Sequence, residues 1–255
     1  MQVGAITGYV DLAQILLYAF WIFFAGLIYY LARENHREGY PMESDSLGRA
    51  VVKGFPVPEP KVFKLANGHE VVIPDVNKGE PPRAFVPTSE LPGSPIEPTG
   101  NPMLDGVGAG AYAIRADVPE VNAHGEAVIR PLRVLAGYDV AKQDVDPRGL
   151  PVLGGDGKQG GIVRDVWLDT SEMLFRYLEV ETNTAAGSRT VLLPMPFARV
   201  RRNAVEVNSI YGHHFGAVPG LKHGDQVTLL EEEKIMAYYG GGTFYADPKR
   251  SEPLL

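Results

Sequence analysis

Four side chains between positions 124 and 172 have the chemistry needed to pass protons near neutral pH. His124 and Glu126 lie two residues apart in a short polar stretch, and Asp169 and Glu172 lie three apart after an apolar run. Histidine titrates at about pH 6.5, and carboxylates with raised pKa values exchange protons in the same range. Solvated turns and turn caps use the same residue types. The spacing alone therefore leaves both a proton-uptake cluster and ordinary polar turns open.

A glycine-rich stretch, residues 154–161, invites comparison with a phosphate-binding loop. That motif needs a glycine and a hydroxyl residue at two positions where this chain has Val152 and Gln159. We therefore predict that residues 154–161 form a hairpin turn.

The sequence favours neither a metal site nor catalysis by this chain alone. His213 and His214, with His223 nearby, have no helical spacing and no carboxylate partner. The chain has no cysteine, which excludes disulfides, thiol nucleophiles and cysteine-ligated zinc. No combination of serine, histidine and aspartate stands out as a triad. We predict no catalytic, cofactor-binding or metal-binding residues.

The net charge of −7 disfavours a general nucleic-acid-binding protein, which needs a basic surface to neutralise phosphates. The one basic cluster, Arg199, Arg201 and Arg202, flanks Asn203 in what we predict to be an exposed hairpin turn. We therefore predict no nucleic-acid partner.

Residues 12–32 are apolar throughout, with no charged residue and one amide, Gln14. A helix of this length spans roughly 31 Å, close to the bilayer hydrocarbon thickness of about 30 Å. A buried core helix is rarely apolar on every face, and a cleaved signal peptide begins with basic residues, which residues 1–11 lack. We therefore predict one transmembrane helix, which is an anchor or one helix of a larger bundle.

The charges on either side of this helix predict its orientation. Arg33, Arg37, Arg49 and Lys53 follow it, whereas Asp11 is the charged residue before it. The positive-inside rule places the C-terminal side in the cytoplasm.

Residues 33–112 are predicted to form an extended segment. Twelve of the 21 prolines and 10 of the 29 glycines lie within residues 39–110, a composition typical of irregular chain. Residues 61–73, interrupted by Asn67 and Gly68, predict a β-hairpin with a two-residue type I′ turn. An isolated hairpin is marginal in water, so we expect a partner protein to cover it.

Residues 113–245 are predicted to form a small β domain, followed by a C-terminal tail at 246–255. Short runs separated by turns predict strands at 151–153, 161–168, 176–181, 189–193 and 203–208. These strands favour a small antiparallel barrel. Residues 225–239 predict a helix capped by Asp225 and ended by the glycines at 240–242. The predicted fold is one N-terminal transmembrane helix plus a mainly-β domain with a short C-terminal helix.

Eight segments of this chain match segments of a known protein family, and they occur in the same order. They are residues 20–30, 37–41, 98–103, 105–108, 165–169, 176–181, 228–235 and 237–241. Through them the chain resembles, almost end to end, the H subunit of the photosynthetic reaction centre of purple bacteria. The resemblance implies that residues 113–245 form a PRC-barrel-like domain. It also implies a single-pass protein of the bacterial inner, intracytoplasmic membrane, with residues 1–11 in the periplasm.

The resemblance implies a non-pigment-binding subunit of a light-driven complex that reduces quinone. In the family, the L and M subunits hold bacteriochlorophyll, bacteriopheophytin, quinones, non-haem iron and carotenoid. The H subunit stabilises that core, shields the quinone sites and helps deliver cytoplasmic protons to the secondary quinone. The implied partners are L and M, membrane lipids and the core light-harvesting antenna. A membrane-tethered PRC-barrel adaptor that binds another protein or RNA is the alternative function, and the acidic charge disfavours RNA.

The resemblance also assigns roles to particular residues. His124 matches a proton-uptake histidine, and Asp169 and Glu172 match two acidic residues on the proton route. Arg176 matches a basic residue beside them.

Two positions depart from the family pattern. Asn122 stands where an aspartate is often found, and Glu126 stands where a second histidine is often found. Glutamate also transfers protons, so Glu126 stays in the predicted cluster. A surface metal site built from two histidines and an aspartate is put in doubt.

Overall fold

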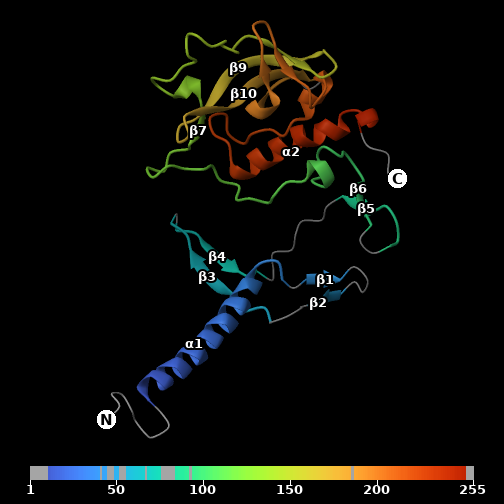
Figure 1. The fold of residues 1–255 in the computed structure, drawn as a ribbon. Helices are drawn as coiled ribbons and strands as arrows, with labels where there is room; N and C mark the ends of the chain where they lie inside the picture. The colour runs from blue at the N-terminus through green and yellow to red at the C-terminus, as the bar shows by residue number, and fades with distance from the viewer. Residues whose placement is uncertain are drawn as a thin grey trace. The chain divides into compact units, whose positions relative to one another are not determined.

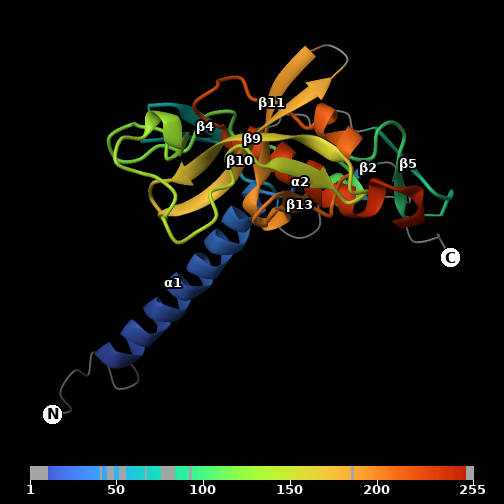
Figure 2. The same ribbon diagram turned by 90° about the horizontal axis from the view of Figure 1, so that it is seen from above.

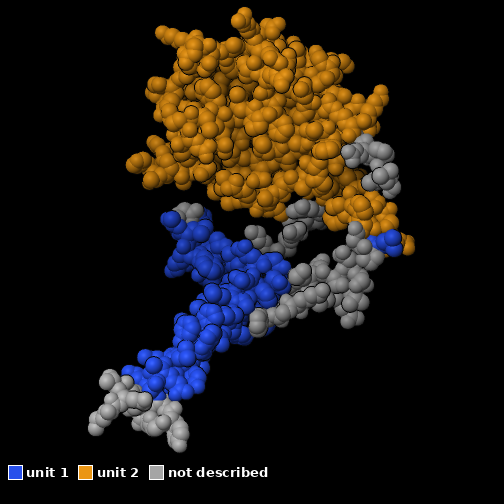
Figure 3. Space-filling model, viewed as in Figure 1, with its two compact units in different colours: residues 1–81, 91–93 blue, residues 82–90, 94–255 orange. Residues whose placement is uncertain are grey.

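The computed structural model divides the chain into two compact units (Figure 3). The residues it describes are 11–40, 42–44, 49–51, 56–66, 68–75, 84–91, 94–184 and 187–250. Unit 1 comprises residues 1–81 with 91–93, and unit 2 comprises residues 82–90 with 94–255. The division falls inside residues 33–112, so the segment predicted to be extended contributes to both units.

Unit 1 is built on α1, Leu12–Glu34, which contains the apolar helix predicted at residues 12–32 (Figure 1). The carboxylate of Asp11 caps it by accepting a hydrogen bond from the backbone N–H of Gln14 at 2.7 Å. No side chain of α1 is buried, and the helix is long and apolar enough to cross a membrane. In a bilayer, lipid tails supply the apolar surroundings that the protein does not.

Two short antiparallel pairs of strands follow α1 in unit 1. β1, Met42–Ser44, pairs with β2, Arg49–Val51, a pair that the sequence did not predict. β3, Lys61–Lys64, pairs with β4, Glu70–Ile73, and confirms the predicted hairpin.

The turn between β3 and β4 differs from the predicted two-residue turn. The backbone N–H of Leu65 donates to the carbonyl of His69 at 2.8 Å, so the ladder extends by one pair and leaves residues 66–68 in the connection. Gly68 has a φ of +82°, which glycine adopts without steric cost. Asn67, on which the turn prediction also rests, lies outside the described residues.

Unit 2 contains a seven-stranded sheet of order β11-β10-β9-β8-β13-β12, with β7 paired to β9. Its strands are β7 Ile129–Pro131, β8 Pro151–Gly154, β9 Gln159–Asp169, β10 Leu174–Thr184, β11 Gly187–Pro194, β12 Arg199–Val200 and β13 Val205–Val207. A separate antiparallel pair joins β5, Phe85–Pro87, to β6, Ile96–Pro98. Short 3-10 helices lie between the elements of both units: η1 Asn35–Arg37, η2 Gly108–Gly110, η3 Leu132–Val134, η4 Met195–Phe197, η5 Gly212–Ala217 and η6 Pro248–Arg250.

One strand pair in this sheet is parallel. β13 runs parallel to β8, whereas the other pairs are antiparallel. The antiparallel character predicted for this domain is confirmed by the other pairs, and β8–β13 is the exception. The two strands are far apart in sequence, so no hairpin between them dictates their relative direction, and alternation within each strand carries no information about it.

The core of unit 2 lies around the two longest strands, β9 and β10. Val163, Trp167, Leu178 and Val180 have at most 1% of their surface exposed. β10 contains register shifts against β9, one of them at Glu179 and Val180, and such bulges increase the twist that a barrel needs.

α2, Leu229–Tyr245, is the C-terminal helix, and it packs beside the sheet (Figures 1 and 2). The predicted range of 225–239 is wrong at both ends. The helix begins after Thr228 because this residue and Glu231 form a capping box, in which each side chain accepts a hydrogen bond from the other's backbone N–H.

The glycines at 240–242 lie inside α2 instead of ending it. A Cβ added at Gly242 would lie 2.3 Å from Cγ2 of Ile210 and 2.8 Å from the carbonyl oxygen of Ser209. The missing side chain therefore lets the helix approach this loop, and packing outweighs the low helix propensity of glycine.

Two alanine substitutions separate packing from propensity in α2. Gly242→Ala should lower the free energy of unfolding by about 1–3 kcal/mol, because the new methyl group overlaps backbone and Ile210. Gly240→Ala should raise it by about 0.5–1 kcal/mol, because the nearest atom to its Cβ, the carbonyl oxygen of Ala109, is 3.9 Å away. Urea unfolding of the full chain in detergent, followed by tryptophan fluorescence, measures both. Equal effects of the two changes would contradict this account of the packing.

Candidate functional site

Asp169 ends β9 and is 3% exposed. Its Oδ1 accepts hydrogen bonds from the backbone N–H groups of Ser171 at 2.9 Å and Glu172 at 3.0 Å. The carboxylate therefore caps the turn between β9 and β10, as the turn interpretation predicted. The other carboxylate oxygen is left for a second partner.

Arg176, on β10, joins the two acidic residues of this turn. Its Nε lies 3.7 Å from Oδ2 of Asp169, and its Nη1 lies 3.7 Å from Oε2 of Glu172. The side chain of Glu172 is 59% exposed, so one carboxylate of this group faces solvent while the other is buried. Asp169, Glu172 and Arg176 are called the turn cluster below.

His124 and Glu126 lie in a different turn, residues 122–126, and both are exposed. Oδ1 of Asn122 accepts hydrogen bonds from the backbone N–H of His124 at 2.9 Å and of Glu126 at 3.0 Å. Its Nδ2 donates to Oε2 of Glu126 at 3.1 Å. A carboxylate at position 122 would repel Glu126 instead. Asn122 and Glu126, which both depart from the family pattern, therefore pair with each other through a hydrogen bond.

β7 brings the two turns next to each other. Ile129 of β7 pairs with Asp169 of β9, and the carbonyl of Val128 accepts hydrogen bonds from both the N–H and the Oγ1 of Thr170. Within the described part of the chain, no hydrogen bond or ion pair links the 122–126 turn to the turn cluster. The structure brings together three of the five predicted site residues and leaves two in the adjoining turn.

A cavity of about 370 Å³ is lined in part by Arg176. Its lining includes Glu120, Arg176, Tyr177, Glu232 and Glu233. Arg176 therefore borders both the solvent-facing turn cluster and this cavity.

Glu232, on α2, is the group in this cavity best suited to hold a proton. Its carboxylate accepts a hydrogen bond from the Tyr177 hydroxyl at 2.7 Å. Burial raises the pKa of Glu232, and the hydrogen bond from Tyr177 and the charge of Arg176 oppose this rise. Burial also raises the pKa of Tyr177, so this hydroxyl remains a donor across the physiological range.

The sequence analysis did not identify Glu232. Its position precedes the buried Ile235 by three residues, which places both on one side of a helix. The three-residue spacing between Glu232 and Ile235 was therefore the sequence signal that could have identified Glu232 as partly buried. The incorrect helix boundaries did not hide it, since residue 232 lies within both the predicted and the observed helix.

Glu232→Gln tests whether this carboxyl gives the domain a pH-dependent stability. A pKa raised above its ordinary value of 4.5 means that the folded state binds the proton more tightly than the unfolded state does. This contribution to stability is present at acid pH and is lost as pH rises through the raised pKa. The unfolding free energy of Glu232→Gln should therefore fall less steeply from pH 4.5 to neutral pH than that of the wild type.

Urea unfolding at a series of pH values gives these slopes. Glu206→Gln removes an exposed carboxylate and is the matched control, which should keep the wild-type slope. Identical slopes for Glu232→Gln and the wild type would contradict the assignment.

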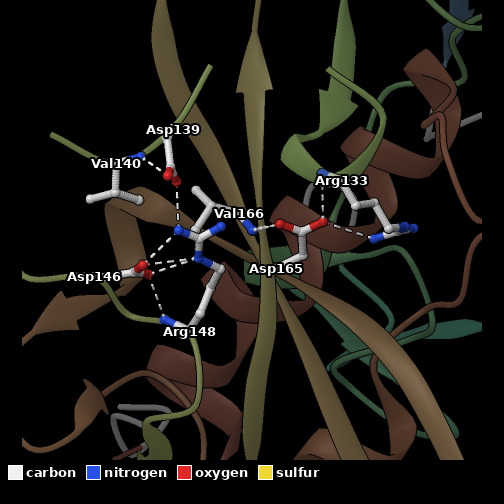
Figure 4. Close-up of polar contacts among 7 residues, drawn as sticks. All are labelled: Arg133, Asp139, Val140, Asp146, Arg148, Asp165 and Val166. Atoms are coloured by element: carbon white, nitrogen blue, oxygen red, sulfur yellow. Dashed lines mark hydrogen bonds and ion pairs between the residues drawn. The ribbon is translucent and has the colours of Figure 1, made fainter. Parts of the chain in front are cut away.

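A second ionic group lies on the barrel and involves two buried carboxylates, of which Figure 4 draws Asp165. Arg133 donates to Oδ2 of Asp165 through its backbone N–H at 3.1 Å and through Nη1 at 3.2 Å. The same Nη1 lies 2.5 Å from Oε2 of Glu179, which also accepts from Nε1 of the buried Trp167 at 2.7 Å. Arg133 further donates to the carbonyl of Gly224.

Arg148 forms a neighbouring ion cluster with Asp139 and Asp146 (Figure 4). Arg133 and Arg148 border one cavity of about 410 Å³, where three arginines face three carboxylates. Because these charges cancel, the cavity has no net charge to attract a charged ligand. Its ion pairs serve to hold the surrounding loops on the sheet.

Arg133→Met should destabilise the domain by about 2–4 kcal/mol at neutral pH, because Asp165 and Glu179 would stay buried without their cation. Arg201→Met breaks an exposed pair with Glu206 and should cost less than about 1 kcal/mol. Urea unfolding compares the two variants. A similar loss in both would show that the buried group has no special role.

The remaining motifs have structural positions. Residues 154–161 contain the predicted hairpin turn: residues 155–158 connect β8 to β9, and Gly157 has a φ of +72°. The predicted arginine hairpin is the β12–β13 turn, where the Arg201 N–H donates to the Ala204 carbonyl at 2.8 Å. Nδ1 of His214 accepts from the N–H of Tyr211 at 3.1 Å, which removes that nitrogen from metal ligation. The described residues contain no group of three or more potential metal ligands.

Two family models match this chain. Residues 4–134, slightly more than half of the 255 residues, match the family described as photosynthetic reaction centre, H-chain N-terminal region. Residues 140–214 match the PRC-barrel domain and cover strands β8 to β13. The apolar helix and the family together fit a single-pass membrane protein. The chain belongs to the photosynthetic reaction centre H-chain family.

Proposed function

We propose that this chain stabilises the L and M subunits of a reaction centre, shields their quinone sites and delivers cytoplasmic protons towards the secondary quinone. The observation that carries the proton-delivery part is the turn cluster. In it a buried and an exposed carboxylate share one arginine, and that arginine borders a cavity with a partly buried carboxyl, Glu232. An arrangement of this kind connects solvent to the domain interior through titratable groups.

The redox groups belong to the partner subunits in this proposal. L and M would hold the bacteriochlorophyll, bacteriopheophytin, quinones, non-haem iron and carotenoid, and the secondary quinone supplies a two-electron, two-proton reduction. This chain binds none of them. Its own residues bind, hold and release protons.

His124 and Glu126 are the outermost groups of the proposed route. Both are exposed, and the backbone of their turn is fixed by Asn122. Imidazole and carboxylate groups are the side chains that most often accept and donate protons in proteins. Because the adjoining turn is joined to theirs through β7, a short water-mediated step leads to Glu172.

Arg176 balances the charge of the inner part of the route. Its guanidinium lies within ion-pair distance of both Asp169 and Glu172, so it offsets their negative charge between proton transfers. Partial burial raises the pKa of Glu232, in the cavity that Arg176 also borders.

The surfaces of unit 1 support a role in assembly. The β3–β4 hairpin exposes Val62, Phe63, Val71 and Val72 by 37–57% each. Val62 pairs with Val72 and Phe63 pairs with Val71, so each face of the hairpin carries an exposed apolar pair that a partner can cover. The L and M subunits are the proposed cover, and α1 anchors the chain with the barrel on the cytoplasmic side.

The double variant Asp169→Asn with Glu172→Gln tests proton delivery. It should slow the proton-coupled second electron transfer to the secondary quinone by at least about tenfold, because both proton-exchanging groups of the turn are lost. The Asp169→Asn change retains a side-chain oxygen that can cap the turn. Flash-induced absorption changes in the complex purified through a tag on this chain measure the rate. Primary charge separation should be unchanged.

Glu181→Gln is the matched control. Glu181 lies on β10, the strand that carries Arg176, but its carboxylate pairs with Arg164. It should leave the second transfer at the wild-type rate. Wild-type kinetics in the double variant at neutral pH would refute proton delivery by the turn cluster. A complex that lacks light-bleachable bacteriochlorophyll bands would refute the proposed partners.

A further inference from the structure

The 3-10 helix η5 begins with a cap that uses a histidine ring. The backbone N–H of Tyr211 donates a hydrogen bond to Nδ1 of His214 at 3.1 Å. A ring nitrogen that accepts a hydrogen bond carries no proton, so His214 is neutral in this arrangement, with its proton on Nε2. A second proton would turn Nδ1 into a donor that faces another donor, and the cap would be lost.

The groups around His214 oppose that second proton more than they favour it. His213 lies beside it in η5, with 3.9 Å between the ring centres, and Cζ of Arg250 lies 4.8 Å from the centre of the Tyr211 ring. Asp156, from the turn between β8 and β9, is the acidic group that favours the proton. Burial lowers the pKa of His214, the two neighbouring basic groups lower it further, and the carboxylate raises it in part.

The other ionisable groups nearby do not stabilise the protonated ring. Lys158 carries the same charge and lies 4.0 Å from its partner, Asp156. Asp247 accepts a hydrogen bond from the hydroxyl of Tyr211 at 2.9 Å. Tyr238 of α2 donates to the histidine's backbone carbonyl at 2.8 Å, and burial raises the pKa of Tyr238 to about 12. The described part of the chain therefore offers the protonated ring no ion-pair partner.

The tyrosine held by this cap also holds the segment that follows α2. Its hydroxyl binds Asp247, and its ring lies under the guanidinium of Arg250 in η6. Arg250 donates further to the carbonyls of Ser209 at 3.0 Å and of Gly242 at 3.3 Å. Ser209 precedes Tyr211 by only two residues. The attachment of η6 to the barrel therefore passes largely through the backbone that His214 caps.

We propose that His214 acts as a proton-sensitive latch, whose neutral ring keeps η5 closed and η6 attached and whose protonation opens η5 and releases η6. The closed arrangement weakens the affinity of His214 for a proton, so a proton favours the open form. The open form therefore becomes more populated as pH falls below the ordinary histidine pKa of 6.5. At neutral pH the latch is closed. This inference requires neither the proposed partners nor proton delivery.

Hydrogen–deuterium exchange of the full-length chain in detergent, read by mass spectrometry, tests the proposal. The series runs from about pH 7.5 to about pH 5.5, which brackets the ordinary titration of histidine. Rates are corrected for the intrinsic pH dependence of amide exchange. Protection of the peptides that cover η5 and η6 should fall about three- to tenfold, because a proton shifts the equilibrium only by the ratio of its affinities for the two forms. Peptides from β9 and β10 should keep their protection.

His214→Asn should abolish this pH dependence. Its amide oxygen can accept the N–H of Tyr211 but takes up no proton in this range. If the substitution loosens η5, the faster exchange will still be independent of pH, so a change in stability does not obscure the result. His213→Asn is the matched control, because it removes the exposed neighbouring imidazole and should keep the wild-type fall in protection.

Constant protection of η5 and η6 in the wild type across the series would overturn the proposal. A wild-type fall in His214→Asn would do the same, as would loss of the fall in His213→Asn, which would assign the proton to the neighbouring ring. A fall confined to η5, with η6 unchanged, would show that the cap does not hold η6 and would also overturn the latch.

Discussion

The burial of two carboxylates beside one guanidinium is the constraint on which the β domain depends. Asp165 and Glu179 lie on adjacent strands and are 5% and 9% exposed, and Arg133 reaches both. Burying such charges is unfavourable unless every one is paired and hydrogen-bonded. The pairing therefore holds η3, which carries Arg133, at a fixed place on the β9–β10 ladder. Since η3 directly follows β7, the same pairing also holds β7 in place, and β7 comes shortly after the 122–126 turn in the chain.

The position of the candidate site follows from that placement. β7 pairs with the last residues of β9, so two polar turns with no sequence relationship become neighbours. Each turn is closed by a side-chain oxygen that accepts two backbone N–H groups, from Asn122 in one and Asp169 in the other. Side chains in these turns are thus held by backbone geometry, while Glu172 and His124 remain in contact with water. A rigid frame with exposed titratable ends is well suited to rapid proton exchange.

Local signals in the sequence predicted the elements well and their long-range relations poorly. The apolar run of α1, the strand alternation and the glycine-rich turns each depend on residues close in sequence. The parallel β8–β13 pair, the Arg133 group and the Tyr177–Glu232 hydrogen bond join residues far apart, and no periodicity encodes them. The glycines at 240–242 were misread because their role depends on a loop about 30 residues away. Residue type and spacing left Asp169 and Glu172 open as proton-exchanging groups or as polar turn residues, and the family resemblance favoured the first and added Arg176.

The division into an N-terminal anchor and a self-contained β domain has a consequence for biosynthesis. α1 emerges from the ribosome first, whereas β8 cannot pair with β13 until residues 205–207 have been made. The chain is therefore tethered to its membrane before its barrel can close. Tethering restricts the search for a partner to the membrane surface and raises the effective concentration of each binding surface near the other. Insertion would then precede folding, and folding would take place where the remaining subunits are found.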